Sequence, residues 1–349
     1  MLFFTFICTF RKKALPLHAK LENAHIPLMK TRILSFITTL LLSLALSAQT
    51  VTHVFAQQVG NTIEITYDLD KPAIVSLLLS RDGGANYAAT PKTVTGDVGA
   101  VTSGHKKMVW DLFADASQWE IQRARFKVVA QKQDKISFTV NGVTFTMISV
   151  EGGTFTMGCT SEQGSDCYND EKPSHQVTLT DYYIGKTEVT QALWKAVMGT
   201  NPSSFKKGDN YPVETVSWED CQTFVQKLNS LLSSQLGGKR FALPTEAQWE
   251  YAARGGHKQP PYQYKYSGSD NVGSVAWYHD NSNGAIHPVA TKSPNTLGVY
   301  DMSGNIMEWC QNGYRRGGSF AFIARICRVS YRSGQPSFSD VMGLRLVCQ

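Results

Sequence analysis

The sequence lacks the short motifs that mark many common enzyme classes. It contains no CxxC pair, no HExxH or HxxxH pair and no GxSxG turn, and its glycine pairs are not followed by the Lys-Ser or Lys-Thr of a phosphate loop. These absences exclude the usual signatures of zinc, serine-hydrolase and nucleotide sites. The histidines after the N-terminal region are scattered and form no ligand pattern: His53, His105, His175, His257, His279 and His287.

A surplus of charge of one sign is also missing from most of the chain. The formal net charge is +6, but residues 1–48 hold six basic residues and one acidic residue. The rest of the chain therefore has 28 basic and 27 acidic residues. A nearly neutral chain has no electrostatic reason to bind nucleic acid or an anionic membrane surface.

One apolar run lies near the N-terminus, in MKTRILSFITTLLLSLALSAQT (29–50). A basic start, an apolar stretch of about 14 residues and small residues after it are typical of a signal peptide. We expect a signal peptide at 29–48, preceded by an upstream extension at 1–28. The run is short for a membrane span, and an anchor at 33–48 is the alternative. The sequence therefore predicts an exported protein (periplasmic, cell-surface or secreted) with no membrane span after cleavage.

Six cysteines follow the predicted signal peptide: Cys159, Cys167, Cys221, Cys310, Cys327 and Cys348. An even number in an exported chain favours disulfides over free thiols. The sequence alone leaves their connectivity open.

Residues 49–133 are expected to form strands. Segments 61–69, 73–80 and 124–131 are alternating or apolar, and the turn signal DGG (82–84) follows the second of them. Short strands with frequent turns predict an all-β, immunoglobulin-like sandwich that serves as an accessory domain. The region has no cluster typical of a functional site, which favours a spacer or a simple binding module.

Residues 134–349 combine short strands, capped helices and long loops. Thr190, Ser217 and Thr245 each precede a helical segment as an N-cap, and the last two are followed by the third-position acid or amide of a capping box. The predicted helices span 191–198, 218–232 and 246–254. A few helices on an irregular β framework, without a repeating βαβ pattern, predict an α+β domain.

Seven motifs occur in order within this second region. They are GGTFTMG (152–158), YYIGKTEVTQALWKAVMG (182–199), PVETVSW (212–218), LPTEAQWEYAARGG (243–256), LGVYDMSGNIMEWC (297–310), RGGSF (316–320) and GLRLV (343–347). The set resembles the formylglycine-generating enzyme family, also called the sulfatase-modifying factor domain. The resemblance covers about 139–349 and implies a loop-rich, C-type-lectin-like α+β fold.

The resemblance implies an oxidase chemistry that this sequence carries only in part. Enzymes of the family use oxygen and a copper(I) ion, held by two cysteines five positions apart after the GGS turn, to convert a sulfatase cysteine to formylglycine. In this sequence the two positions hold Phe322 and Cys327. Phenylalanine offers no lone pair to a soft metal ion, so we favour no catalytic site. The alternative is a copper-dependent formylglycine-generating oxidase that uses Cys327, with Cys310 as a displaced second cysteine.

Cys327 also has a structural interpretation. A disulfide between Cys310 and Cys327 would leave Cys159–Cys167 and Cys221–Cys348 as the remaining pairs. In that case Cys327 would stabilise the fold and take no part in chemistry.

Structural calcium is a further implication of the resemblance. One ion would be held by Asn305 and Glu308 with turn carbonyls, and a second by Asn271 and Asn281. Amide, carboxylate and carbonyl oxygens are the ligands that calcium prefers. At the second site the spacing is shorter than in the family, and an asparagine stands where a carboxylate is expected. The alternative for both is a loop held by hydrogen bonds alone.

The segment after the GGS turn resembles the variable region of proteins diversified by retroelements. Such systems change adenine-rich asparagine codons on a C-type-lectin scaffold. The corresponding positions here are Ala321, Phe322, Ile323, Ile326, Tyr331, Ser333, Gly334, Phe338, Asp340 and Val341. All these residue types are reachable from such codons by changes in the first two bases, whereas the neighbouring Gln335 is not. Ordinary drift, or an apolar core segment, is the alternative.

We therefore predict an exported ligand-binding protein that lacks sulfatase-modifying activity. Exposed aromatic and small residues on a stable framework make adaptable contacts. The predicted contact residues are Ala321, Phe322, Ile323, Ile326, Tyr331, Ser333, Phe338 and Asp340. The partner would be an unknown protein or cell-surface ligand, and not nucleic acid.

Overall fold

The computed structural model describes residues 4–5, 50–115, 125–334 and 341–349. The chain divides into two compact units, Met1–Gln133 and Asp134–Gln349. Within the described residues, no helix is both long and apolar enough to cross a membrane. The predicted signal peptide lies outside the described residues.

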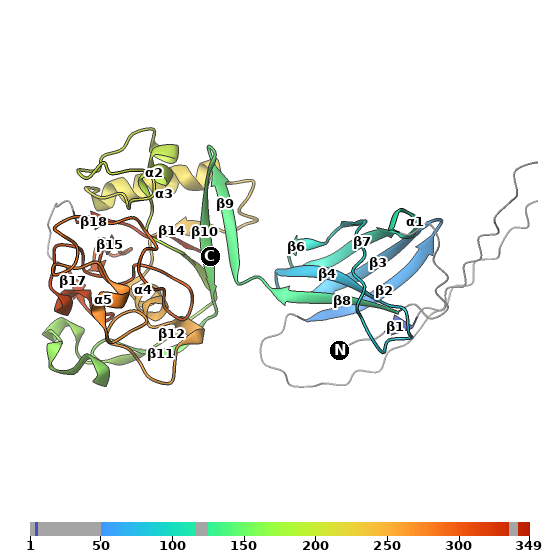
Figure 1. Cartoon of the computed structure of the whole chain (residues 1–349), viewed down its shortest axis with the longest axis horizontal. Helices are drawn as coiled ribbons and strands as arrows, with labels where there is room; N and C mark the ends of the chain where they lie inside the picture. Colours follow the sequence, from blue (N-terminus) through green and yellow to red (C-terminus); the bar gives the residue numbers. More distant parts are fainter. Residues whose placement is uncertain (1–3, 6–49, 116–124, 335–340) are drawn as a thin grey trace, which may run out of the picture. The chain divides into compact units, whose positions relative to one another are not determined.

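The first unit consists of two antiparallel four-stranded sheets (Figure 1). Their strand orders are β1-β8-β4-β6 and β2-β3-β7-β5. Side chains from both sheets, among them Ile65, Leu77 and Trp110, form one hydrophobic core. The strands predicted in this region are confirmed. The elements are β1 (Phe4–Thr5), β2 (Val51–Val59), β3 (Thr62–Leu69), β4 (Ala73–Ser80), β5 (Val94–Gly96), β6 (Gly99–Val101), β7 (Gly104–Asp111), α1 (Leu112–Asp115) and β8 (Arg125–Lys132).

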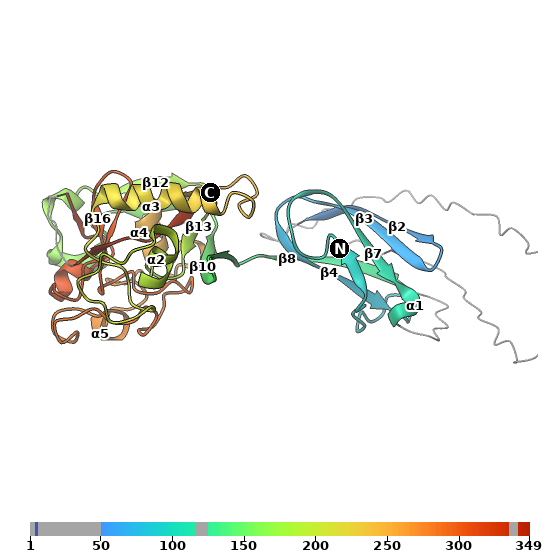
Figure 2. The ribbon, with the colours of Figure 1, turned by 90° about the horizontal axis from the view of Figure 1, so that it is seen from above.

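The second unit contains a five-stranded sheet with the order β14-β19-β13-β10-β9. Helices α2 and α3 lie side by side (Figures 1 and 2) and share a hydrophobic core with this sheet. The ring of Trp194 in α2 stacks on that of Phe224 in α3, with centroids 4.9 Å apart. This part of the unit is β9 (Lys135–Val140), β10 (Val143–Val150), β13 (Tyr182–Gly185), α2 (Gln191–Met198), α3 (Trp218–Leu231), β14 (Phe241–Ala242) and β19 (Val347–Cys348).

The rest of the second unit is mostly loop and short elements, as the sequence predicts. Strands β11 and β12 pair with each other, and a small sheet has the order β17-β16-β15-β18. These elements are β11 (Gly153–Met157), η1 (Ser161–Asp166), η2 (Asn169–Glu171), β12 (His175–Leu179), α4 (Glu246–Ala253), η3 (Gly256–Lys258), α5 (Val272–Val275), β15 (Met307–Trp309), β16 (Arg315–Arg316), η4 (Ala324–Cys327), β17 (Arg332–Ser333) and β18 (Met342–Gly343). The α+β prediction for this region is confirmed.

The three predicted helix starts are confirmed by their caps. The side chain of Thr190 accepts a hydrogen bond from the backbone N–H of Leu193 at 3.2 Å, and the helix ends at Gly199 in the left-handed conformation. Ser217 and Thr245 each form the predicted capping box. Because a cap depends on residues three positions apart, the local sequence suffices to predict it.

Candidate functional site

The segment after the GGS turn is a loop fixed at both ends by strand pairing. Arg316 in β16 lies opposite Arg332 in β17, and β16 also pairs with β15. Gly318 has a φ of +71°, and a Cβ atom there would lie 2.7 Å from Cys327 Sγ and 2.9 Å from the carbonyl oxygen of Ile326. Only glycine fits this close approach, which places the 3-10 turn η4 directly against the glycine pair.

The side chains of this loop divide into a buried set and an outer set. The buried set is Gly317, Gly318, Ser319, Phe320, Cys327, Arg328, Val329 and Ser330. The outer set is Ala321, Ile323 and Gly334, which are exposed, and Phe322, Ile326, Tyr331 and Ser333, which are partly buried. Every described residue predicted to make contacts is therefore in the outer set.

Three residues of the predicted variable positions differ from this pattern or cannot be placed. Phe338 and Asp340 lie outside the described residues. Val341 is buried in a hydrophobic cluster with Ile306 and Met342, which at this position agrees with the alternative of an apolar core segment. The apolar side chain at 341 completes the core next to β18.

Buried ion pairs hold the loop from the interior. Arg328 donates to both carboxylate oxygens of Glu171, at 2.8 and 2.6 Å, and Arg316 donates to Glu250 at 2.8 Å. Burial alone would raise the pKa of Glu171, but hydrogen bonds from Arg328 and Ser330 lower it below its usual value. Bidentate arginine–carboxylate pairs are geometrically specific, so they orient the backbone on which the outer set is carried.

The sequence prediction missed Tyr168 and Arg325, which join the outer set. The centre of the Arg325 guanidinium lies 4.1 Å from the Tyr168 ring centroid. The Tyr168 ring meets that of Tyr331 edge-on, with centroids 5.7 Å apart. A contact between positions so far apart in the chain has no local sequence signal. The neighbouring Cys167 was the one indication that the loop carrying Tyr168 is fixed.

The cysteine pairing is simpler than the sequence suggested. The Cys159–Cys167 disulfide is confirmed. The pairings Cys310–Cys327 and Cys221–Cys348 are wrong, because all four residues are free, buried thiols. Cys310 and Cys327 belong to different hydrophobic clusters. Their sulfur atoms thus pack as small apolar groups.

The residues at the copper positions do not fit a copper(I) ion. Burial raises the pKa of the Cys327 thiol to about 12 and also raises the pKa of Cys310, so both are protonated near neutral pH. Phe322 packs against the cluster that contains Ile306, and its carbonyl oxygen accepts a hydrogen bond from the backbone N–H of His279 at 3.0 Å. A copper(I) ion of this family needs two thiolates, and the two copper positions here offer one buried sulfur, that of Cys327, and no second one.

Asn305 and Glu308 do not fit a calcium ion either. Both carboxylate oxygens of Glu308 accept hydrogen bonds from Arg345 at 3.0 Å or less, and Trp249 donates to Oε2 at 2.6 Å. The side-chain oxygen of Asn305 accepts from the backbone N–H of His287 at 3.0 Å. The buried Arg345 already neutralises the Glu308 carboxylate and takes up both of its oxygens, which agrees with the alternative of a hydrogen-bonded loop.

The second predicted calcium set is also engaged by the protein itself. The side-chain oxygen of Asn271 accepts from the backbone N–H of Gly273 at 3.0 Å and caps α5. The side-chain oxygen of Asn281 accepts from the backbone N–H of Tyr278 at 2.8 Å. Within the described ranges, no group of three or more His, Cys, Asp or Glu side chains is placed to hold a metal ion.

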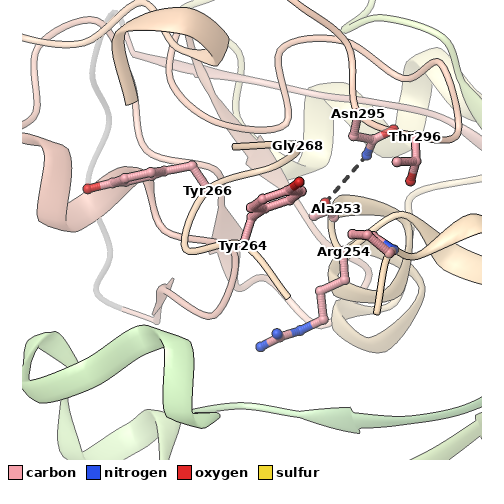
Figure 3. Close-up of a pocket in the computed structure, with 8 residues that line it drawn as sticks. Ala253, Arg254, Tyr264, Tyr266, Gly268, Asn295 and Thr296 are labelled. Carbon is pink, nitrogen blue, oxygen red and sulfur yellow. Dashed lines mark hydrogen bonds between the residues drawn. The ribbon is translucent and has the colours of Figure 1, made fainter. Parts of the chain in front are cut away.

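Two hollows in the second unit do not involve the outer set. The first is shown in Figure 3, where the side-chain amide of Asn295 donates to the carbonyl oxygen of Ala253 at 3.4 Å. Arg254 also lines this hollow, and its guanidinium donates to Glu162 at 2.6 Å. The second hollow, of about 240 Å³, is lined by residues of β10 and α2 together with Lys186 and Asn210.

Comparisons with known proteins assign the second unit to a family and find several relatives of the chain. Residues 134–349 match the family described as "Sulfatase-modifying factor enzyme 1-like domain". The chaperone protein LppX of Paenibacillus barcinonensis is 32% identical over 259 residues, covering 58% of this chain and 86% of the relative. The inactive C-alpha-formylglycine-generating enzyme 2 of Bos taurus is 27% identical over 284 residues, covering 59% of this chain and 88% of the relative.

A solved structure shows the same similarity. Variable protein 1 of Treponema denticola superposes with a TM-score of 0.54 at 30% sequence identity. The match covers 62% of this chain and 99% of that protein.

Proposed function

The chain belongs to the sulfatase-modifying factor enzyme 1-like family through residues 134–349, and from this premise we propose that it is a ligand-binding protein without sulfatase-modifying chemistry. The family resemblance drawn from the seven motifs is confirmed. The observation that carries the proposal is the division of the loop after β16 into a buried, ion-paired set and an outer set. A surface that can change while its support stays fixed suits binding.

The chemistry of the loop supports binding over oxidation. Cys327 is a protonated, buried thiol, and Phe322 supplies no second sulfur. One relative, 88% of whose length is covered by the match, is named an inactive formylglycine-generating enzyme. The proposal requires neither copper nor calcium.

Diversification and export extend this proposal. The similarity to a protein named variable protein 1, and the outer placement of Ala321, Phe322, Ile323, Ile326, Tyr331 and Ser333, support diversification by a retroelement. The DNA beside the gene should then hold a reverse transcriptase gene and an adenine-rich near-copy of the segment's coding sequence. Their absence would remove diversification and leave ligand binding standing. We also propose that the protein is exported and that its first unit is an immunoglobulin-like accessory domain. Export is tested by locating the protein in cell fractions.

Binding is tested with random peptides displayed on phage and selected against the full chain. Ile323 is 56% exposed in the outer set, and Leu231 on α3 is a matched control at 48% exposed. We expect Ile323→Ser to weaken binding of the selected peptides about tenfold, whereas Leu231→Ser leaves it unchanged. Equal effects of the two substitutions, or none, would count against the proposed face.

The oxidase alternative is tested separately. The protein is titrated with copper(I) and then incubated with oxygen and a cysteine-containing sulfatase peptide. We expect no stoichiometric copper(I)–thiolate complex and no formylglycine by mass spectrometry. Formylglycine that depends on Cys327, shown by its loss in Cys327→Ala, would overturn the proposal.

A further inference from the structure

We propose that the partner is a peptide segment with a side-chain carboxylate, which binds the guanidinium of Arg325 where it lies on the ring of Tyr168. The inference deepens the proposed function and rests on it. We define the binding face as Tyr168, Ile323, Arg325, Ile326 and Tyr331. Tyr168 and Arg325 are not among the predicted variable positions, so they would supply a constant contact beside the changing ones.

Arg325 has donors to spare. Its Nε atom donates to the carbonyl oxygen of Asp166 at 2.8 Å, and its guanidinium covers the Tyr168 ring at 4.1 Å. Among the residues that the structure describes, no carboxylate lies within ion-pair distance of it. The two terminal nitrogens of a guanidinium form a planar fork that matches a carboxylate. A stacked, partly exposed guanidinium is therefore oriented before the partner arrives.

The charges around Arg325 favour an anionic partner. Asp166 is ion-paired with Lys265, and its pKa is lowered first by that hydrogen bond and to a lesser degree by nearby charges that include Arg325. The carboxylate of Asp166 is therefore engaged by Lys265, and among the described residues Arg325 has no ion pair of its own. A carboxylate from the partner would balance the remaining positive charge, and a lysine or arginine at the same place would be repelled.

Tyr168 is held on both sides. The Cys159–Cys167 disulfide ends at the preceding residue. The backbone N–H of Tyr168 donates to Glu171 at 2.8 Å, and Glu171 is itself fixed by the buried Arg328. A rigid tyrosine loses little conformational entropy on binding, and tyrosine and arginine are enriched among residues that dominate interface energies.

The neighbouring turn adds an apolar contact. The backbone N–H of Ile326 donates to the carbonyl oxygen of Ile323 at 2.9 Å, at the start of η4. Residues three positions apart in such a turn lie on the same side, so the two isoleucines form one apolar surface on the same turn that carries Arg325. The partner segment should therefore carry an aliphatic or aromatic residue next to its Asp or Glu.

The test selects phage-displayed random peptides against the full chain and against Arg325→Gln. We expect Asp or Glu beside an apolar residue to be enriched on the natural protein and not on the variant. A selected peptide and its Asp→Asn or Glu→Gln counterpart are then titrated. The natural protein should prefer the acidic peptide about ten- to a hundredfold, and Arg325→Gln should bind both alike.

Two further variants separate charge from geometry. Arg325→Lys keeps the charge without the fork and should retain only part of the preference. Tyr168→Phe keeps the ring under the guanidinium and should match the natural protein. Thermal unfolding is measured for each variant, and a midpoint equal to that of the natural protein shows that folding is intact.

The outcomes are distinguishable. Enriched peptides without an acid, an acid preference that survives in Arg325→Gln, or no enriched peptide would overturn the inference. If Ile323→Ser weakens binding while Arg325→Gln does not, the carboxylate contact fails and the proposed function stands. If neither substitution weakens the binding of selected peptides, both fail.

Discussion

At the scale of single residues, buried charge decides how the second unit responds to pH. Asp301 is 3% exposed, and its carboxylate accepts a hydrogen bond from the backbone N–H of Ala290 at 2.7 Å. Burial raises its pKa from 3.8 to about 6, although the Ala290 bond and nearby Arg345 act against the rise. Between these two pH values the unfolded chain has lost a proton that the folded chain still holds. The contribution of Asp301 to the free energy of unfolding therefore falls as the pH rises from about 3.8 to about 6.

Asp301→Asn should remove that pH dependence. Asparagine carries no charge, can still accept from Ala290 and tolerates the φ of +58° at this position. We expect the stability of the variant relative to the natural protein to increase by about 2 kcal/mol between pH 4 and pH 7. Chemical denaturation of both proteins at the two pH values measures the difference. A difference that does not change with pH would contradict the assignment.

Gly318 is the residue on which the loop after β16 most depends. Gly318→Ala would place a methyl group against Cys327 and Ile326 in addition to imposing left-handed backbone strain. Gly313→Ala is the matched control, because Gly313 has a similar φ of +79° and nothing within 4 Å of an added Cβ atom. We expect the control to lose about 1 kcal/mol and Gly318→Ala to lose a further 1–3 kcal/mol, roughly. Denaturation midpoints compare the two, and equal losses would argue against a steric role.

At the scale of elements, the helices are encoded locally. Helix α3 begins after Ser217, whose hydroxyl accepts from the backbone N–H of Asp220 at 3.0 Å, while Asp220 in turn accepts from the backbone N–H of Ser217. Local hydrogen bonds of this kind are available to the chain before any tertiary contact forms. For that reason the helix starts were predictable and the ends of the longer loops were not.

Ser217→Ala should remove one side of this capping box. The loss of the cap is worth about 1 kcal/mol. Ser230→Ala on the same helix is a suitable control, since Ser230 is exposed and its hydroxyl bonds only to the carbonyl oxygen of Gln226. The control should change stability by less than about 0.5 kcal/mol. Guanidinium denaturation of both variants checks the prediction, and a control as destabilised as Ser217→Ala would refute it.

Loops required more than local sequence. Asn305 and Glu308 are three positions apart, and their residue types suit calcium. The partner of Glu308 is nevertheless Arg345, which approaches from another part of the chain. A residue's type indicates what it can bind, whereas its actual partner depends on which distant segment is packed against it. The same reason explains why two of the three suggested cysteine pairings were wrong.

At the scale of the whole molecule, the two units have separate cores. Among the described residues, the buried core of the first unit draws on residues before 127, and the buried clusters of the second unit draw on residues after 137. Each unit can therefore bury its own apolar side chains without the other. The matched family also begins at residue 134.

Residues 134–349 should fold when expressed alone. The expected result is a single cooperative thermal transition by circular dichroism, with a near-ultraviolet signal from packed tryptophans such as Trp194 and Trp249. The full chain is the reference. A fragment that retains far-ultraviolet signal but loses the near-ultraviolet signal would show that its core needs the first unit.

By itself, the sequence determined the capped helices, the strands of the first unit, the family of the second unit and the missing sulfur at Phe322. All of these depend on residue type and short spacing. Only the tertiary structure decided that Val341 is core, that Glu308 pairs with Arg345, that four cysteines remain thiols and that Tyr168 meets Arg325. These outcomes depend on contacts between distant segments, because burial and charge pairing are determined only when those segments pack together in the folded protein.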